Sequence, residues 1–488
     1  MTIDASRRAF LQRASALSLA GTATPWALNL AAMGEAAAQT ATDYKALVCV
    51  FLYGGNDYGN TLIPVDGTSY AAYAGMRPTL AYSAASLVPT TLAPSVALPG
   101  GRQYALAPEL APLLPHFVSG KLGVMLNVGT LIQPTTKAQY TAASVPLPPK
   151  LFSHNDQQSV WQSSAPEGAA SGWGGRMGDL FMAGNGNATF TCVNVSGNAV
   201  FLSGNSAVQY QVSTSGPVAF SGIAQPLFGS TACSAALQQL VTAPRTHLFE
   251  SEYTRVAARS ISAGGTLTAA LAGAPAIATP FPIGNALADQ LKFVARMIST
   301  AATTSTRRQV FFVSIGGFDT HDGLAQIHPG LLTTVAGAMN AFYQSTVELG
   351  VANQVTAFTA SDFGRTLTAD DGSDHGWGQH ALHAGRRRAR RPLLRHGAGS
   401  GQQRPRRRGT GALVAEHLGR PVRGHARQVV RHCRQRPAHR AAQFIALECE
   451  PAQPRLRLTM CLSAAMSQRT RRSATGRLPS GRWPRESR

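Results

Sequence analysis

The chain has 488 residues, a formal net charge of +21 and a pI near 10.6. The excess charge lies at one end: 26 of the 44 basic residues, all arginine, and 4 of the 23 acidic residues fall within 381–488, which leaves 18 basic and 19 acidic residues in 1–380. Residues 1–380 are numerous enough to bury a sizeable hydrophobic core. Their nearly neutral net charge argues against nucleic-acid binding, for which an excess of basic residues is expected.

Residues 381–488 have the composition of GC-rich DNA read out of frame. They contain no Lys, Asp, Asn or Tyr, whose codons all have A in the middle position. Reading the codons one base later lets Ala381 onward encode HFMLGGAVRGG and 417–432 encode TSVDQYAATLAKWFG, which are ordinary protein sequences. We therefore predict a frameshift just after His380 and a disordered tail over 381–488. The alternative is a genuine Arg-rich tail that binds nucleic acid, and a DNA read across codon 380 separates the two.

Residues 1–38 are predicted to be a signal peptide. The stretch SRRAFLQ at 6–12 resembles the twin-arginine motif, an Ala-rich apolar region follows, and AAA at 36–38 is a cleavage site. The alternative is a cytosolic amphipathic helix. Export by the twin-arginine translocase would place domain 39–380 in the periplasm or outside the cell. No later apolar run approaches the ~20 residues of a membrane span.

Within the mature part, the first predicted strand is the apolar run Lys45–Leu52. It leads into the Gly-rich sequence YGGNDYGN, which exposes Asn56 and Asp57 at the end of the strand. A simple Asn/Asp/Gly turn is the alternative interpretation. A short helix near Pro108–Val118 and a second strand over Lys121–Val128 follow.

The next segments carry candidate substrate-contacting groups. Ser153 lies at a predicted helix N-terminus, where it is either a cap or a nucleophile beside amides that stabilise an anion, and His154 follows it. Arg176, after a Gly-rich turn, pairs with an anion or with a structural carboxylate. Residues 185–235 predict a β-rich insertion, and helices are expected over Pro244–Ala258 and Ile283–Thr300.

Two further buried strands end in richer loops. Gln309–Ile315 runs into GGFDTHDG, which contains Asp319 and His321, and a helix over Leu324–Leu349 comes next. The last strand, Gln354–Ala360, leads into a loop with four candidate residues: Asp362, Arg365, His375 and His380.

Three predicted strands thus end in loops that contain Asp57, Asp319 and Asp362, and two of these loops add histidine. The carboxyl ends of parallel strands meet at one crevice, where such groups converge. Mixed Asp/His ligands suit Zn²⁺, Mn²⁺, Fe or Mg²⁺. The cysteines before the tail, Cys49, Cys192 and Cys233, have no paired metal-binding spacing.

The motifs GGND, LFSHNDQQ, GWGGRM, GGFDTHDG and TASDFGRT…GSDHGWG occur in order after the leader. Together they resemble the bacterial family labelled domain of unknown function 1501, which is sulfatase-like within the alkaline-phosphatase superfamily. The resemblance implies a three-layer α/β/α fold with a mainly parallel sheet. It also implies metal ions bound by residues that match the superfamily ligands, namely Asp57, Asp319, His321, Asp362, and His375 or His380.

Two departures from that pattern limit what the resemblance implies. Phe363 replaces the superfamily's usual histidine, and the Cys/Ser-x-Pro-x-Arg nucleophile motif has no clear counterpart, so Ser153 is assigned from its position alone. The predicted function is a metal-dependent hydrolase of phosphate or sulfate esters, with Ser153 and Arg365 catalytic and Asn56, His154 and Arg176 contacting substrate. The alternative is a non-catalytic envelope or secreted protein that binds a glycan or a partner on the same fold.

Overall fold

The computed structural model describes residues 43–367, 370–385 and 393–394, the last two by their backbone only. The expected signal peptide over 1–38 and most of the Arg-rich tail lie outside the described residues.

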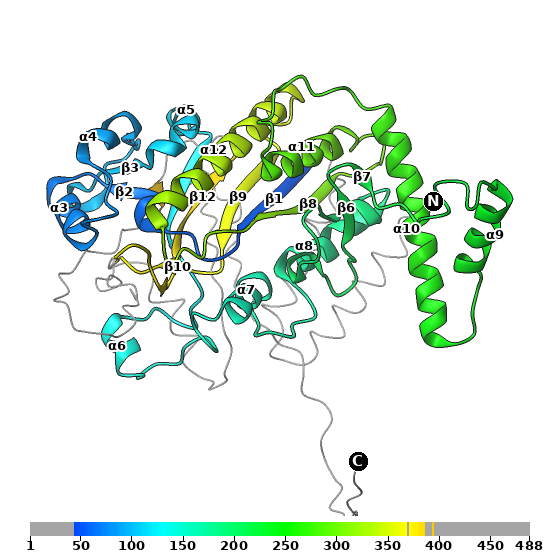
Figure 1. Cartoon of the computed structure of the whole chain (residues 1–488), viewed down its shortest axis with the longest axis horizontal. Coiled ribbons are helices and arrows are strands. Elements are labelled where there is room, and N and C mark those ends of the chain that lie inside the picture. Colours follow the sequence, from blue (N-terminus) through cyan, green and yellow to red (C-terminus); the bar gives the residue numbers. More distant parts are fainter. Residues whose placement is uncertain (1–42, 368–369, 386–392, 395–488) are drawn as a thin grey trace, which may run out of the picture.

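A nine-stranded sheet runs through the described part of the chain, in the spatial order β13-β4-β12-β9-β1-β8-β5-β6-β7 (Figure 1). The pairings of β1 with β8 and β9, of β5 with β8 and β6, and of β4 with β13 are parallel. β12 is antiparallel to β9 and β4, and β7 is antiparallel to β6. The strands are β1 (Lys45–Leu52), β4 (Leu122–Val128), β5 (Cys192–Asn194), β6 (Tyr210–Ser213), β7 (Gly216–Pro217), β8 (Arg308–Ile315), β9 (Val355–Ser361), β12 (Gln379–Ala384) and β13 (Leu393–Leu394).

The central strand β1 is buried on both faces because its side chains alternate between two hydrophobic clusters. Val48 and Val50 belong to the cluster that includes Leu291 of α11 (Ala286–Ser299) and Met339 of α12 (Leu324–Glu348). Cys49 and Phe51 point to the opposite face and share a cluster with aromatic residues of two other helices. These residues are Trp161 of α7 (His154–Ser163) and Trp173 of α8 (Trp173–Phe181).

Helices therefore cover both faces of a mainly parallel sheet, which confirms the predicted three-layer α/β class (Figure 1). None of the helices in the described ranges is long and apolar enough to cross a membrane. The other helices are α3 (Gly67–Met76), α4 (Ala84–Leu87), α5 (Leu114–Val118), α6 (Lys137–Thr141), α9 (Thr231–Thr242) and α10 (Leu248–Ala272). The 3₁₀ turns are η1 (Tyr58–Asn60), η2 (Val88–Thr90), η3 (Pro99–Gly101), η4 (Pro108–Leu113), η5 (Met182–Gly184), η6 (Ala188–Phe190) and η7 (Val200–Leu202).

Two small antiparallel pairs lie outside the main sheet. One joins β2 (Leu62–Pro64) to β3 (Tyr104–Leu106). The other joins β10 (Gly364–Arg365) to β11 (His375–Gly376), and it folds the loop after β9 back on itself. This second pair brings His375 back to the carboxyl end of β9.

The structure corrects two sequence expectations. The segment 185–235 contains short strands, but β5, β6 and β7 extend the main sheet instead of forming a separate insertion, and α9 begins at Thr231. Residues 381–384, expected to be disordered, are part of strand β12, because Leu382 and Ala384 pack into the core while the backbone pairs with β4 and β9.

Candidate metal centre

The carboxyl ends of three adjacent parallel strands meet at one edge of the sheet, as the sequence predicts. Leu52 of β1 is in register with Ile315 of β8 and with Ser361 of β9. Asp362 follows β9 directly, and Asp319 lies shortly after β8. These two carboxylates therefore lie close enough for a single side chain to contact both.

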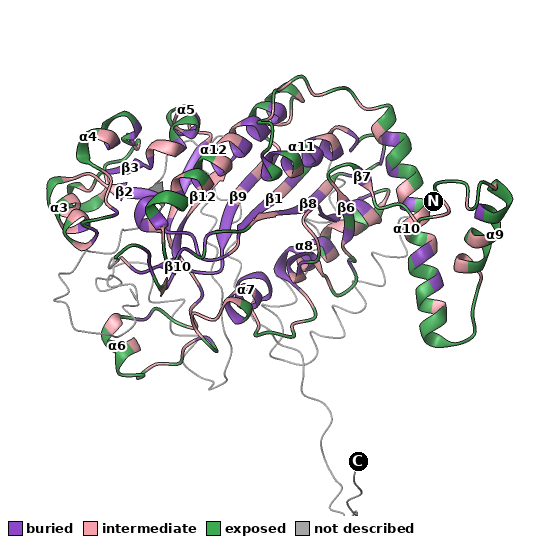
Figure 2. Cartoon of the chain, viewed as in Figure 1, coloured by how far each residue is buried: buried purple, intermediate pink, exposed green. Residues whose placement is uncertain are grey.

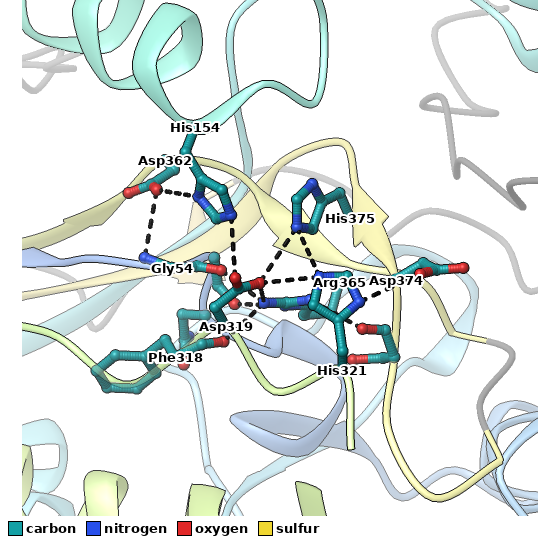
Figure 3. A network of polar contacts seen from close by, with 12 residues as sticks. Gly54, His154, Phe318, Asp319, His321, Asp362, Arg365, Asp374 and His375 are labelled. Carbon is teal, nitrogen blue, oxygen red and sulfur yellow. Dashed lines mark hydrogen bonds and ion pairs between the residues drawn. The ribbon is translucent and has the colours of Figure 1, made fainter.

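His154, the first residue of α7, is that side chain (Figure 3). Its Nδ1 lies 2.7 Å from Oδ2 of Asp362, and its Nε2 lies 3.3 Å from Oδ2 of Asp319. Asp362 is buried and also accepts hydrogen bonds from the Gly54 amide at 3.2 Å and from Gln158 Nε2 at 2.9 Å. The position of Asp362 is thus fixed by β1, by α7 and by its own strand.

Gly54 lets the backbone after β1 approach the cluster closely. Its φ is +116°, and a Cβ at this position would lie 2.4 Å from the amide nitrogen of Asp319. Another residue would be strained by this φ and would also push the Asp319 loop away. The Gly-Gly sequence after the first strand is therefore needed so that the loops of β1 and β8 can touch.

Three imidazoles surround the Asp319 carboxylate. His375 Nε2 lies 3.2 Å and His321 Nε2 lies 3.1 Å from Oδ1 of Asp319, and these two nitrogens are 3.0 Å apart. One ligand atom each from His154, Asp319 and His375 lies within 4.8 Å of the others. Nitrogen and oxygen donors gathered in this way form a candidate metal-binding group.

The second ring nitrogen of each histidine faces an oxygen atom. His154 Nδ1 faces Asp362, His375 Nδ1 donates to the Phe152 carbonyl at 2.8 Å, and His321 Nδ1 lies 3.3 Å from Asp374 Oδ1. Because a carbonyl only accepts, His375 in its neutral form turns the lone pair of Nε2 toward Asp319. Metal-binding histidines are typically oriented by such contacts.

Two buried atoms of the cluster, His154 Nε2 and Asp362 Oδ1, have no hydrogen-bond partner. His154 Nε2 is buried and makes no hydrogen bond, although Asp319 Oδ2 lies 3.3 Å away. A buried nitrogen beside a carboxylate is stabilised by a proton or by a cation held between the two. The donor set and this unpaired nitrogen together fit a bound metal ion.

The electrostatic environment differs among the members of the cluster. The hydrogen bond to Asp362 raises the pKa of His154 against the opposing effect of burial. Burial lowers the pKa of His375. Burial acts to raise the pKa of Asp319, but the hydrogen bond and charge of Arg365 outweigh it and leave that pKa below its ordinary value. Asp319 is therefore an anion at neutral pH.

Arg365 is completely buried and orients Asp319, with which it forms an ion pair. Its remaining N–H groups donate to main-chain carbonyls of three loops. The acceptors are Gly54 at 2.7 Å, Gly55 at 3.0 Å, Phe318 at 3.1 Å and Ser373 at 2.8 Å. The guanidinium thus joins the loops and faces Asp319, whereas the sequence suggested that it faces a substrate anion.

Phe363, for which the sequence resemblance led us to expect histidine, packs against two of the imidazoles. Its ring centroid lies 4.8 Å from that of His154 and 4.4 Å from that of His375. The side chain cannot bind a metal, but it fixes the planes of both rings. Phe363 therefore contributes no donor and supports two residues that do.

Asp57 and Asn56 lie away from this cluster. Both carboxylate oxygens of Asp57 accept from Arg77, at 2.7 and 2.9 Å, and both side chains are fully buried. The Asn56 side chain contacts Thr61 at 3.0 Å and His328 at 3.0 Å in the interior. Their internal partners occupy the atoms that were predicted to face a metal or a substrate.

Ser153 and Arg176 also have internal partners. Ser153 Oγ donates to Asp156 at 2.9 Å, although the residue stands between Phe152 and His154, which both belong to the site. Arg176 donates to the carbonyls of Ser163 at 2.9 Å and Ser171 at 3.0 Å. Ser153 remains beside the cluster, whereas Arg176 braces two turns of the chain.

His380 lies within strand β12, apart from the other histidines. Its Nδ1 accepts from the Asn127 amide at 3.3 Å, and its ring packs edge-on against Tyr58. Burial lowers its pKa to about 4. A partly accessible metal-binding loop was expected here, but pairing with β4 draws this residue into the sheet.

The buried, neutral state of His380 predicts a loss of stability in acid. In the unfolded chain the pKa of His380 is about 6.5, whereas in the folded chain it is about 4. Between these two pH values the unfolded chain binds more protons than the folded chain. The free energy of unfolding therefore decreases as the pH falls from about 6.5 to about 4. The maximum loss is about 1.4 kcal/mol for each unit of the pKa difference. When the free energy of unfolding is measured with urea across this pH range, it should fall less steeply in His380→Phe than in the unmodified chain. The exposed control His247→Gln should follow the unmodified chain, and an unchanged decline in His380→Phe would contradict the assignment.

Some contributors to the site were not identified as such from the sequence. His154 was expected to contact substrate, but it stands among the candidate metal ligands, and Gln158 was not singled out. Gln158 follows His154 by four residues on α7, so both side chains lie on one face and reach Asp362. That spacing was the signal available in the sequence.

Comparisons with known proteins place the chain in a family and point to distant structural likenesses. Residues 44–387 match the family described as "Protein of unknown function (DUF1501)". No curated protein sequence matches the chain significantly.

Among solved structures, the chain is similar to Ps i-CgsB in complex with k-i-k-neocarrahexaose, with a TM-score of 0.30 and 9% identity over 71% of this chain. It spans 66% of that protein, just under two thirds. It is also similar to an alkaline phosphatase from the Antarctic bacterium TAB5, with a TM-score of 0.25 and 9% identity over 74% of this chain and 93% of that one. The α/β class assigned above is therefore argued from the sheet topology and not from these likenesses.

Proposed function

We infer a function from the site itself, because the chain belongs to the DUF1501 family, which is described only as a family of unknown function. We propose that it is a metal-dependent hydrolase of small phosphate or sulfate esters that acts after twin-arginine export. The observation that carries the proposal is the convergence of His154, Asp319 and His375 at the ends of parallel strands. The three motifs that contain these residues, LFSHNDQQ, GGFDTHDG and GSDHGWG, support it further.

His154, Asp319 and His375 are the residues that would hold the ion, with His321 beside them. Imidazole nitrogens favour Zn²⁺, Mn²⁺ or Fe, whereas Mg²⁺ prefers oxygen ligands. When bound, such an ion lowers the pKa of a coordinated water and polarises an ester oxygen. Asp362 holds the Nδ1 proton of His154, so that Nε2 is directed at the ion.

Charge counting favours an anionic ligand. With the histidines neutral, the carboxylates of Asp319 and Asp362 and the guanidinium of Arg365, which are the charged groups acting on His154, sum to −1. The carboxylate of Asp374 beside His321 is mostly exposed, so solvent screens its charge and it is left out of this sum. A divalent ion changes this sum to +1 in a partly buried setting, where charges interact more strongly than in water. This balance suits a phosphate or sulfate ester, and we propose that Ser153, the residue before α7, contacts it after its hydroxyl leaves Asp156.

The test uses the purified full-length chain loaded separately with Zn²⁺, Mn²⁺ and Fe²⁺. We expect hydrolysis of para-nitrophenyl phosphate or para-nitrophenyl sulfate that a chelator abolishes and added metal restores. His375→Ala should lose at least about 100-fold in rate, the size of effect expected when a catalytic metal is no longer held. His247→Ala, an exposed histidine on another part of the chain, should retain full activity. Turnover that survives both chelation and His375→Ala would overturn the metal role.

A second candidate function rests on the partners of the polar groups. Arg365, Arg176 and Ser153 all direct their polar atoms to partners within the protein. An exported protein that binds metal and a glycan or another anion without cleaving it fits this arrangement. A metal-loaded chain that turns over neither ester but binds an oligosaccharide saturably in calorimetry would favour binding over hydrolysis.

A further inference from the structure

The α9–α10 hairpin projects from the edge of the molecule (Figure 1). The second half of α10 is anchored, since Ala263 and Leu267 belong to the main hydrophobic core and Gly264 faces Pro217 of the edge strand β7. In the first half, the residues that are buried are Thr254 and Ala257, which are small. The first half of α10 and all of α9 therefore form an arm, defined as residues 231–259, beside the sheet.

Most of the arm is exposed (Figure 2). It carries a stripe of large apolar side chains that face solvent. Phe249, Tyr253 and Val256 are 78%, 61% and 42% exposed, and their spacing of four and three residues places them on one face of α10. Leu248 and Leu240 are also exposed, by 75% and 60%. Contiguous apolar surface on the order of a few hundred Å² typically marks an interaction site.

Charged residues follow a fixed order along the same half of α10. Glu250 and Glu252 come first, and Arg255 and Arg259 follow. Glu252 pairs with Arg255 in its own helix, and it lies on the same flank of the stripe as Arg259, seven residues later. When two copies of this helix pack antiparallel about a two-fold axis just beyond Tyr253, Glu252 of one copy comes beside Arg259 of the other. The same axis brings Tyr253 of one copy opposite Val256 of the other. The stripe and the charges are thus both complementary to themselves, as a two-fold interface requires.

We propose that the arm is a homodimer interface, in which the α10 stripes of two copies pack antiparallel and are flanked by Glu–Arg pairs. A membrane surface is less suited to this helix, because interfacial helices carry mainly basic residues around the apolar face, and here acidic and basic residues are equal in number. The interface lies on the edge of the molecule that carries β7, so dimerisation leaves the metal centre independent of it.

The first test measures the mass of the full chain by sedimentation equilibrium. We expect a dimer that weakens at least tenfold in Phe249→Ser with Tyr253→Ser. The control variant Ile283→Ser with Val347→Ser removes two exposed apolar residues outside the arm, so the dimer should persist. A monomer at every concentration reached, or a dimer unaffected by the arm variant, would overturn the proposal. Circular dichroism establishes that each variant is folded.

A charge-swap experiment tests the antiparallel geometry directly. Glu252→Arg should be monomeric, as should Arg259→Glu, because each variant repels its own copy. Mixing the two should restore a dimer that contains one chain of each kind. Two variants that stay monomeric when mixed would contradict the pairing, and vesicle binding that requires the stripe would assign it to a lipid surface instead.

Discussion

Replacing Arg77 with methionine is expected to lower the free energy of unfolding by about 3–5 kcal/mol, as breaking a buried ion pair does. Arg77 and Asp57 are completely buried, and their side chains pair at 2.7 and 2.9 Å. Without the guanidinium, Asp57 keeps a hydrogen bond from the Gly59 amide at 3.2 Å as its recorded partner. Arg77 also donates to the carbonyls of Thr366 and Leu367, so the loop after β10 loses an anchor.

The double variant Asp57→Asn with Arg77→Met provides the control for this prediction. Removing both charges leaves no isolated ion in the interior, so its loss of stability should be smaller than the sum of the two single losses. Urea midpoints at a fixed pH measure all three variants. Metal content per folded molecule should not change in Asp57→Asn, since Asp57 lies in this pair and not in the cluster. A loss of metal without a loss of stability would restore the role that the sequence suggested.

The strands that determine the sheet were predictable because they are buried on both faces. Lys45–Leu52, and the runs that form β4, β8 and β9, read as continuous apolar segments, which is typical of a parallel sheet under two helix layers. Strand β12 has the sequence QHALHA, without β-branched residues, and its place depends on pairing with β4 and β9. Such long-range pairing cannot be detected in the local pattern.

The helix α10 illustrates the same limit in another way. It was expected to end at Ala258, yet it continues through Gly264 and Gly265 to Ala272. Glycine disfavours helices when it is exposed. Here Gly264 faces Pro217 of β7, and Leu267 is buried in the core, so packing outweighs the local preference.

Part of the candidate site was predictable from the order and direction of the strands. Asp319 and Asp362 follow adjacent parallel strands, so their convergence depended only on the sheet being parallel. Asp57 follows a third such strand, but it turns under η1 to meet Arg77, which lies at the end of α3, far from any motif. An apparent ligand becomes structural when a buried partner of opposite charge reaches it first. The sequence alone does not show which of the two occurs.

Replacing Asp319 with asparagine is expected to abolish metal retention, with a loss of affinity above about 100-fold, the upper end of what an orienting residue costs. The three imidazoles all direct a nitrogen toward this carboxylate, at distances of 3.1 to 3.3 Å. Asparagine keeps the shape and still accepts a hydrogen bond from Arg365, so the fold should persist. Titration of the apo protein with Zn²⁺, followed by calorimetry, measures the change.

Asp362→Asn tests a residue that orients the candidate ligand His154 and is not itself a proposed ligand. Asp362 contacts Nδ1 of His154, so its loss should weaken metal binding by about 10–100-fold, less than the loss for Asp319. Asp66→Asn, which alters the cap of α3, should retain full affinity. Equal affinities in all three variants would mean that the cluster does not hold the metal. The predicted order, Asp319 before Asp362 before Asp66, follows from one feature of the structure: nitrogens of the three imidazoles face Asp319, and a cation is what stabilises that arrangement.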